Sequence, residues 1–191
     1  MPTMMKHTLV MLVQDRPGVL NRVTSMIRRR NFNIDSITVG HSVTPGLSRM
    51  VISVDGAVTA VEQVRKQLDK IVEVVKITDI TNENIISREL ALIKVESTPE
   101  TRQEIIRIAT DVFRANIVDL TPETIIIEIS GDEGKVLSLI ELLRGFGLVE
   151  LARTGRIAIT RGALGPLQKP EHDSSKKPKL PKTKKTKTAK T

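Results

Sequence analysis

The stretch that decides the fold is HTLVMLVQDRPGVLNRVTSMIRRRNFNIDSITVG, residues 7–40. Residues 7–14 are mostly aliphatic and β-branched, as in a buried strand, and the tetrapeptide DRPG then breaks that pattern. Apolar residues next recur at helical spacing over residues 19–30, and an arginine triplet closes this helix, where cations complement its dipole. Residues 33–40 alternate in polarity again. The sequence therefore predicts strand, helix and strand in succession.

The same style of sequence continues outward to residue 80. After a Thr-Pro-Gly turn, residues 47–54 are strand-like, residues 58–68 have helical spacing and residues 72–80 form a last strand. The order is β-α-β-β-α-β, which is typical of a ferredoxin-like sandwich. We therefore predict a first domain over residues 1–80.

The pattern restarts after a short polar segment that follows residue 80. The predicted strands cover residues 88–95, 116–120, 124–129 and 147–152, with a possible extra strand at 156–160, and the predicted helices cover 101–115 and 136–146. This order predicts a second ferredoxin-like domain over residues 81–162. The expected fold class is thus α+β, with two βαββαβ sandwiches. Because each unit of roughly 80 residues can bury only about 60–65% of the surface of its unfolded chain, we expect oligomerisation.

The formal charge of +8 is concentrated in the last part of the chain. Residues 163–191 hold nine lysines but only Glu171 and Asp173 as acidic residues, so residues 1–162 are close to neutral. The tail is rich in Lys, Pro, Thr and Ser and has almost no apolar side chains. Such a segment cannot offset its chain entropy by burial, so we predict a disordered, solvated appendage.

Other features argue against a membrane protein or an enzyme that acts alone. The chain has no cysteine, which fits a cytoplasmic protein without disulfides. It shows neither an apolar run long enough to span a bilayer nor a signal peptide. The three histidines lack metal-ligand spacing, and GDEGK at residues 131–135 lacks the spacing of a phosphate loop. We expect no catalytic residue, no bound metal and no cofactor in this chain.

The interruption at residues 15–18 has the composition of a helix start. Asp15 stands at the expected N-cap, Pro17 in the first turn and Gly18 just inside the helix. Free backbone N–H groups at a helix start attract an anion, and Gly18 has no Cβ to keep a carboxylate away from the backbone. The turn is therefore a candidate site for a small carboxylate.

A second candidate group follows the helix. Asn33 opens the next strand, which we expect to lie beside the turn, and its amide can donate to a carboxylate and accept from an ammonium group. Asp15, Gly18 and Asn33 together could hold the zwitterionic head of a free amino acid, with Val13 and Ile34 lining a pocket for its side chain. The alternative is that these residues form only a good helix start and a turn.

Residues 9–54, LVMLVQDRPGVLNRVTSMIRRRNFNIDSITVGHSVTPGLSRMVISV, closely resemble the small, regulatory subunits of acetolactate synthase (acetohydroxyacid synthase), whose first unit is an ACT domain. Residues 88–95, 113–131 and 135–162 are similar to the C-terminal domain of that family. The resemblance extends over residues 6–162 with both halves in order. The lysine-rich tail has no counterpart in it.

The resemblance implies a regulatory role in valine, leucine and isoleucine biosynthesis. Subunits of this family bind a branched-chain amino acid, commonly valine, at the interface of an ACT homodimer. They activate a separate catalytic large subunit, which uses thiamine diphosphate, Mg²⁺ and FAD, and they make it subject to feedback inhibition. The implied partners of this chain are therefore that catalytic subunit, a second copy of the chain and an amino-acid effector.

The resemblance also carries over to individual site residues. The matched effector-binding residues are Asp15, Pro17, Gly18 and Val19 in the turn, and Asn33 and Ile34 at the next strand. Asp15 is a partial departure, since some members of the family have asparagine there. The second half has Ser-Thr-Pro-Glu at residues 97–100, without an equivalent glycine, so we expect no effector site in the second domain.

Two rival functions fit part of the pattern. The common RNA-recognition module shares this topology, and the tail is basic, but that module stacks bases on sheet aromatics and the central strands here have none. We therefore expect no nucleic-acid partner. An ACT-type amino-acid sensor that regulates a different enzyme is the second alternative.

Overall fold

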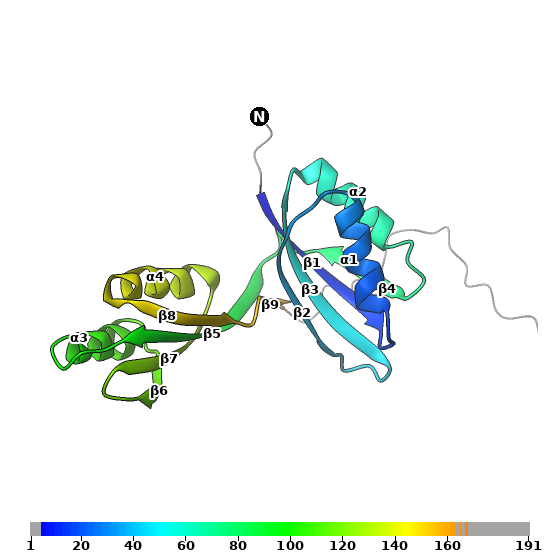
Figure 1. The fold of residues 1–191 in the computed structure, drawn as a ribbon. Coiled ribbons are helices and arrows are strands. Elements are labelled where there is room, and N and C mark those ends of the chain that lie inside the picture. The colour runs from blue at the N-terminus through cyan, green and yellow to red at the C-terminus, as the bar shows by residue number, and fades with distance from the viewer. Residues whose placement is uncertain (1–4, 163–164, 166, 168–191) are drawn as a thin grey trace, which may run out of the picture.

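The computed structural model describes residues 5–162, 165 and 167, which form two α+β units side by side (Figure 1). The first unit runs β1 (Met5–Gln14), α1 (Val19–Arg29), β2 (Ile34–His41), β3 (Leu47–Gly56), α2 (Val58–Leu68) and β4 (Val74–Asp79). Its antiparallel strands lie in the order β2-β3-β1-β4. The predicted ferredoxin-like topology is confirmed for this unit.

Alternation along the two central strands builds the first core. Leu9, Met11 and Val13 on β1 and Met50 and Ile52 on β3 are fully or almost fully buried. They project to the same face of the sheet as Val23 and Ile27 of α1, and together they form one hydrophobic cluster. Helices α1 and α2 thus cover one face of the sheet, and its other face is left for a different neighbour.

The second unit repeats this plan with two irregular helices. It runs β5 (Ile85–Glu96), α3 (Arg102–Arg107), a π-helical turn η1 (Ile108–Val112), β6 (Asn116–Leu120), β7 (Thr124–Gly131), α4 (Glu133–Leu143), a 3₁₀ turn η2 (Arg144–Phe146), β8 (Leu148–Arg153) and β9 (Ile157–Thr160). The sheet order is β6-β7-β5-β8, so the second predicted sandwich is confirmed as well. Its core includes the alternating Ile125, Ile127 and Ile129 of β7.

Two helix boundaries differ from the prediction for local reasons. The helix predicted over residues 101–115 is split between α3 and the π-helical turn. The helix predicted from residue 136 already begins at Glu133, because Asp132 caps it and its Oδ1 accepts a hydrogen bond from the backbone N–H of Lys135 at 2.8 Å.

Strand β5 joins the two units. Its first part, residues 85–88, pairs with β9, whereas residues 89–96 pair with β7 and β8 in the second sheet. The β5–β9 ribbon packs on the helix-free face of the first sheet, where Ala158 of β9 contacts a cluster that contains Val10 and Val51. The sequence predicted a possible strand at 156–160, but not this packing.

The predicted domain limits, 1–80 and 81–162, remain predictions. The tail predicted over residues 163–191 lies outside the described residues, apart from Gly165 and Leu167. Within the described part of the chain, no helix combines the length and the apolar character that a membrane span requires.

Candidate functional site

The predicted effector turn connects β1 to α1, and Gly18 is its key residue. Gly18 is the N-cap of α1 and has φ +86°, in the left-handed region that favours glycine. The prediction that Asp15 is the N-cap is wrong, because the left-handed turn at Gly18 places Asp15 well before the helix. Asp15 instead lies with Oδ2 3.2 Å from Nδ1 of His41, at the end of β2.

No side chain caps the start of α1, so the positive end of its dipole is open to an anion. Pro17 and Gly18 are exposed. A Cβ built on Gly18 would meet nothing within 4 Å, so in the single chain glycine serves the backbone conformation rather than a close approach. The geometry can therefore receive a carboxylate at the backbone of this turn.

Three predicted apolar contacts are differently placed. Val13 and Val19 are buried in the first core, 2% and 4% exposed. They pack beneath the backbone of the turn as core residues and have almost no surface that a ligand could contact. Ile34 is half-buried and packs against the same core. It borders a hollow of about 370 Å³ on the flank of α1, lined by Asn21, Thr24, Ser25, Arg28, Phe32, Asn33 and Ile34.

The exposed Asn33 does not lie beside the turn of its own chain, contrary to the prediction. Strands β1 and β2 are both antiparallel to β3 and hence parallel to each other. Ile34 pairs with Val54 at one end of the sheet, whereas Gln14, the last residue of β1, pairs with Leu47 at the other. The length of β2 therefore separates the two groups, roughly 20 Å at about 3.3 Å per residue.

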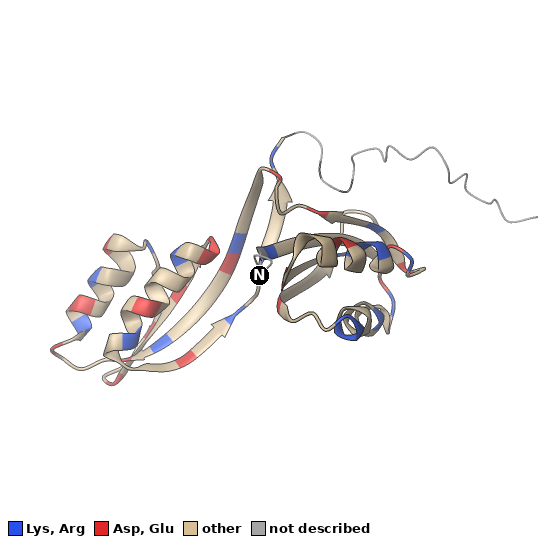
Figure 2. Ribbon diagram, turned by 90° about the horizontal axis from the view of Figure 1, so that it is seen from above, with Lys and Arg blue, Asp and Glu red and all other residues tan. Residues whose placement is uncertain are grey.

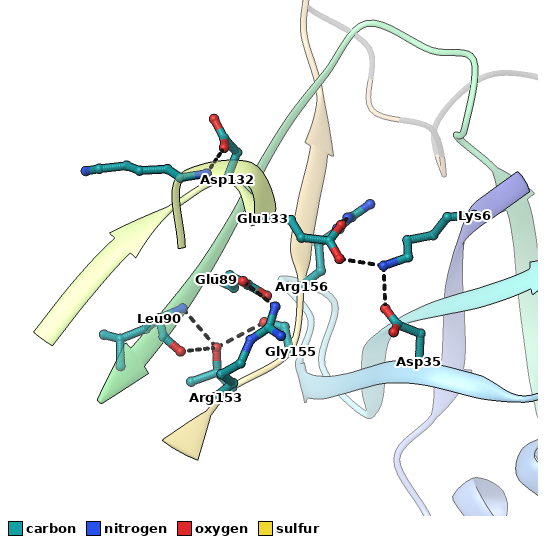
Figure 3. A network of polar contacts seen from close by, with 11 residues as sticks. Lys6, Asp35, Glu89, Leu90, Asp132, Glu133, Arg153, Gly155 and Arg156 are labelled. Atoms are coloured by element: carbon teal, nitrogen blue, oxygen red, sulfur yellow. Dashed lines mark hydrogen bonds and ion pairs between the residues drawn. The ribbon is translucent and has the colours of Figure 1, made fainter. Parts of the chain in front are cut away.

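A second polar site lies between the two units and is centred on Glu133, the first residue of α4 (Figure 3). Its carboxylate accepts from Nζ of Lys6 on β1 at 2.5 Å and from the guanidinium of Arg156. Lys6 also pairs with Asp35 of β2 at 2.9 Å, and Arg156 donates to Oγ1 of Thr8 at 3.2 Å. These contacts connect β1 and β2 of the first unit to α4 and to the segment before β9.

The hollow at this joint has a volume of about 250 Å³. Its lining also includes Glu89, 6% exposed, which accepts a hydrogen bond from Arg153 at 2.6 Å. Its charged groups are thus matched in pairs, which is typical of a structural contact between domains. Because Asp35 directly follows Ile34, the joint connects β2, which begins at the predicted effector residue Ile34, to the second unit.

Burial opposes the charged form of Lys6, but hydrogen bonds to the carboxylates of Glu133 and Asp35 outweigh it, so the pKa of Lys6 is raised.

Nothing in the sequence singles out Lys6, Glu133 or Arg156 as members of one site. These residues are far apart along the chain, and each is an ordinary surface charge by its local sequence. No local signal could have joined them.

Acidic and basic residues both occur along the helices and strands of the two units (Figure 2). Across residues 5–162, 165 and 167, no three His, Asp or Glu side chains gather in a way that could hold a metal ion. The described part of the chain therefore contains a turn that can bind a small anion and an ionic contact between the two units, and no metal centre.

Known proteins resemble both halves of the chain. Residues 9–76 match the family described as "AHAS small subunit-like ACT domain", and residues 88–162 match "Small subunit of acetolactate synthase". The chain is 51% identical over 158 residues to the "Probable acetolactate synthase small subunit" of Archaeoglobus fulgidus. This match covers 83% of this chain and 98% of that protein. It is 49% identical over 160 residues to the "Acetolactate synthase small subunit" of Bacillus subtilis, with coverages of 83% and 92%.

A solved structure agrees with this. The crystal structure of the acetolactate synthase small subunit from Thermotoga maritima superposes with a TM-score of 0.76 at 46% identity, and covers 84% of this chain and 99% of that one. The likeness thus includes both units and not the first alone.

Replacing Lys6 by methionine should destabilise the joint in a pH-dependent way. Since the folded pKa of Lys6 is raised, its contribution is fully present below the usual lysine pKa of about 10.4. The contribution is lost as the pH rises through the raised pKa. Urea unfolding of wild type and Lys6→Met should therefore differ at pH 7, by up to about 1 kcal/mol, and converge at strongly alkaline pH. Lys70→Met, on an exposed lysine outside the joint, is the control. A difference that persists unchanged at alkaline pH contradicts this account.

Proposed function

The chain belongs to the family of acetolactate synthase small subunits, and from this premise we propose that it activates a separate catalytic large subunit and makes it sensitive to an amino-acid effector. The observation that carries the proposal is identity of about half the residues over nearly the full length of the relatives. On this proposal the chain is not catalytic by itself. The catalytic subunit would hold the thiamine diphosphate, Mg²⁺ and FAD, and the complex would work in the cytoplasm.

The effector site we propose is shared between two copies of the chain. The turn at Gly18 and the residues Asn33 and Ile34 lie at opposite ends of the first sheet, so one copy cannot bring them together. Strand β2 is an edge strand, and no strand pairs with its outer side within the described chain. Two copies that pair their β2 edges antiparallel would place Asn33 of each beside the Asp15–Gly18 turn of the other.

The chemistry of such a site suits a free amino acid. The open start of α1 would hold the carboxylate, and Asp15 would attract the ammonium group. The amide of Asn33 can serve both groups, since it donates and accepts. Ile34 and Phe32 give the otherwise polar lining of the hollow an apolar part, and valine is the effector we propose.

Mixing the purified chain with the catalytic subunit tests the proposed function directly. We expect the rate of acetolactate formation to rise several-fold on addition of the chain and to fall again with valine. The control is the catalytic subunit alone, which should be slower and respond little to valine. If the chain binds valine but leaves the rate unchanged, it senses an amino acid for a different enzyme.

Gly18→Asp should abolish valine inhibition and leave activation largely intact. The new carboxylate would repel the ligand carboxylate, and a side chain at φ +86° adds strain of roughly 1–2 kcal/mol. Gly162→Asp is a matched control, because Gly162 also has a left-handed φ, +98°, and open space around its Cβ. The valine concentration for half inhibition should rise at least tenfold in the first variant only. An unchanged valine response in Gly18→Asp would contradict the site.

Mixed dimers test whether the site is shared. Gly18→Asp and Asn33→Ala should each abolish valine binding as homodimers, because each damages both sites. When the two variants are unfolded and refolded together, the mixed dimers hold one intact site and one doubly damaged site. Calorimetry should then recover about a quarter of the wild-type binding sites, as half of the dimers are mixed. Recovery of none would show that both residues act within one chain.

A further inference from the structure

An apolar groove lies on the helix-free face of the first sheet, beside the β5–β9 ribbon. It has a volume of about 420 Å³ and takes its walls from both units. Val39 and Val51 contribute from the first sheet, and Ile86, Ile157 and Ile159 from the ribbon. A groove of this size and lining is typical of a binding site rather than of a packing gap.

The ribbon presents exposed isoleucines to this groove. Ile157 and Ile159 are 55% and 57% exposed, whereas the other isoleucines in residues 6–162 are buried or half-buried. Their neighbour Ala158 points the other way and is buried against the sheet. The ribbon thus packs on the sheet with one face and leaves an apolar face uncovered along the groove, where a partner could cover it.

A cation without a carboxylate lies in the same groove. Arg49 is partly buried, and its Nη2 donates to the backbone oxygen of Ala158 at 2.7 Å. Burial lowers the pKa of its guanidinium. None of the ion pairs found in the described part of the chain includes Arg49 or the nearby Arg88. A partly buried cation of this kind favours a negatively charged partner.

We propose that this groove receives a segment of the catalytic subunit that carries apolar side chains and a carboxylate. The apolar side chains would cover Ile157 and Ile159, and the carboxylate would pair with Arg49. The inference rests on the proposed function, since it assumes that a catalytic subunit binds. Thr38, Gly40 and His41 of the edge strand β2 also line the groove, so a second copy paired at that edge would lie beside the bound segment.

The groove can be filled by one substitution that the backbone tolerates. Gly40 of β2 lines the groove, pairs with Arg49 across the strands, and has open space around its Cβ and no positive φ. Gly40→Leu should weaken binding of the full-length chain to the catalytic subunit at least tenfold, measured by titration calorimetry. Arg49→Met should weaken binding as well and reduce its salt dependence. The matched control is Gly145→Leu, at a glycine with equally open space in the second unit.

Each outcome decides one question. If the wild-type chain does not bind the catalytic subunit, the proposed function fails. If the wild-type chain binds and Gly40→Leu binds equally well, the groove is not the contact. If Gly40→Leu weakens self-association in analytical ultracentrifugation and not the catalytic-subunit complex, the occupant is a second copy. Equal weakening by Gly145→Leu would also overturn the assignment.

Discussion

Strand β5 is shared by two layers of structure, and the relation between the domains depends on it. One part of it pairs with β9 over the first sheet, and the rest lies in the middle of the second sheet between β7 and β8. A strand that is hydrogen-bonded along its length bends only where pairing is interrupted. The two units therefore cannot turn freely about a loop. A change in the arrangement of one unit must either move the other or break strand pairs and the cluster around Ala158.

The ion pairs around Glu133 are a second connection between the two units. Glu133 lies at the positive end of the α4 dipole, which favours its charge, and two cations from other elements meet it there. Removing one partner of such a network leaves another charge poorly compensated. Because Lys6 pairs with both Asp35 and Glu133, a shift of β2 changes the position of a charge at the start of α4. The contact thus connects β2, which begins at the predicted effector residue Ile34, to the second unit.

Local sequence patterns predicted most of the fold. The alternation in residues 33–40 and the helical spacing in residues 58–68 depend on neighbours in the sequence, so they could be read directly. The misplaced groups depend on three-dimensional relations. Asp15 was misassigned as a cap because nothing local shows that Gly18 takes a positive φ. The position of Asn33 could have been predicted from helix length. The 11 residues of α1 rise about 1.5 Å each, so the helix runs along the sheet from one end to the other. Asn33 follows the helix and must therefore lie at the end opposite to the turn at Gly18.

The proposed effector site, divided between two copies, would make regulation depend on how the two copies are arranged. If each effector site takes the turn from one copy and Asn33 from the other, the ligand interacts only with arrangements in which the two sheets are correctly aligned. A ligand shifts an equilibrium only by its difference in affinity between states, and a divided site makes this difference large. Since coupling free energies are reciprocal, a catalytic subunit that favours one arrangement of the dimer must change effector affinity by the same factor. On the proposed function, the shared strand β5 and the joint at Glu133 would extend that arrangement beyond the first sheet.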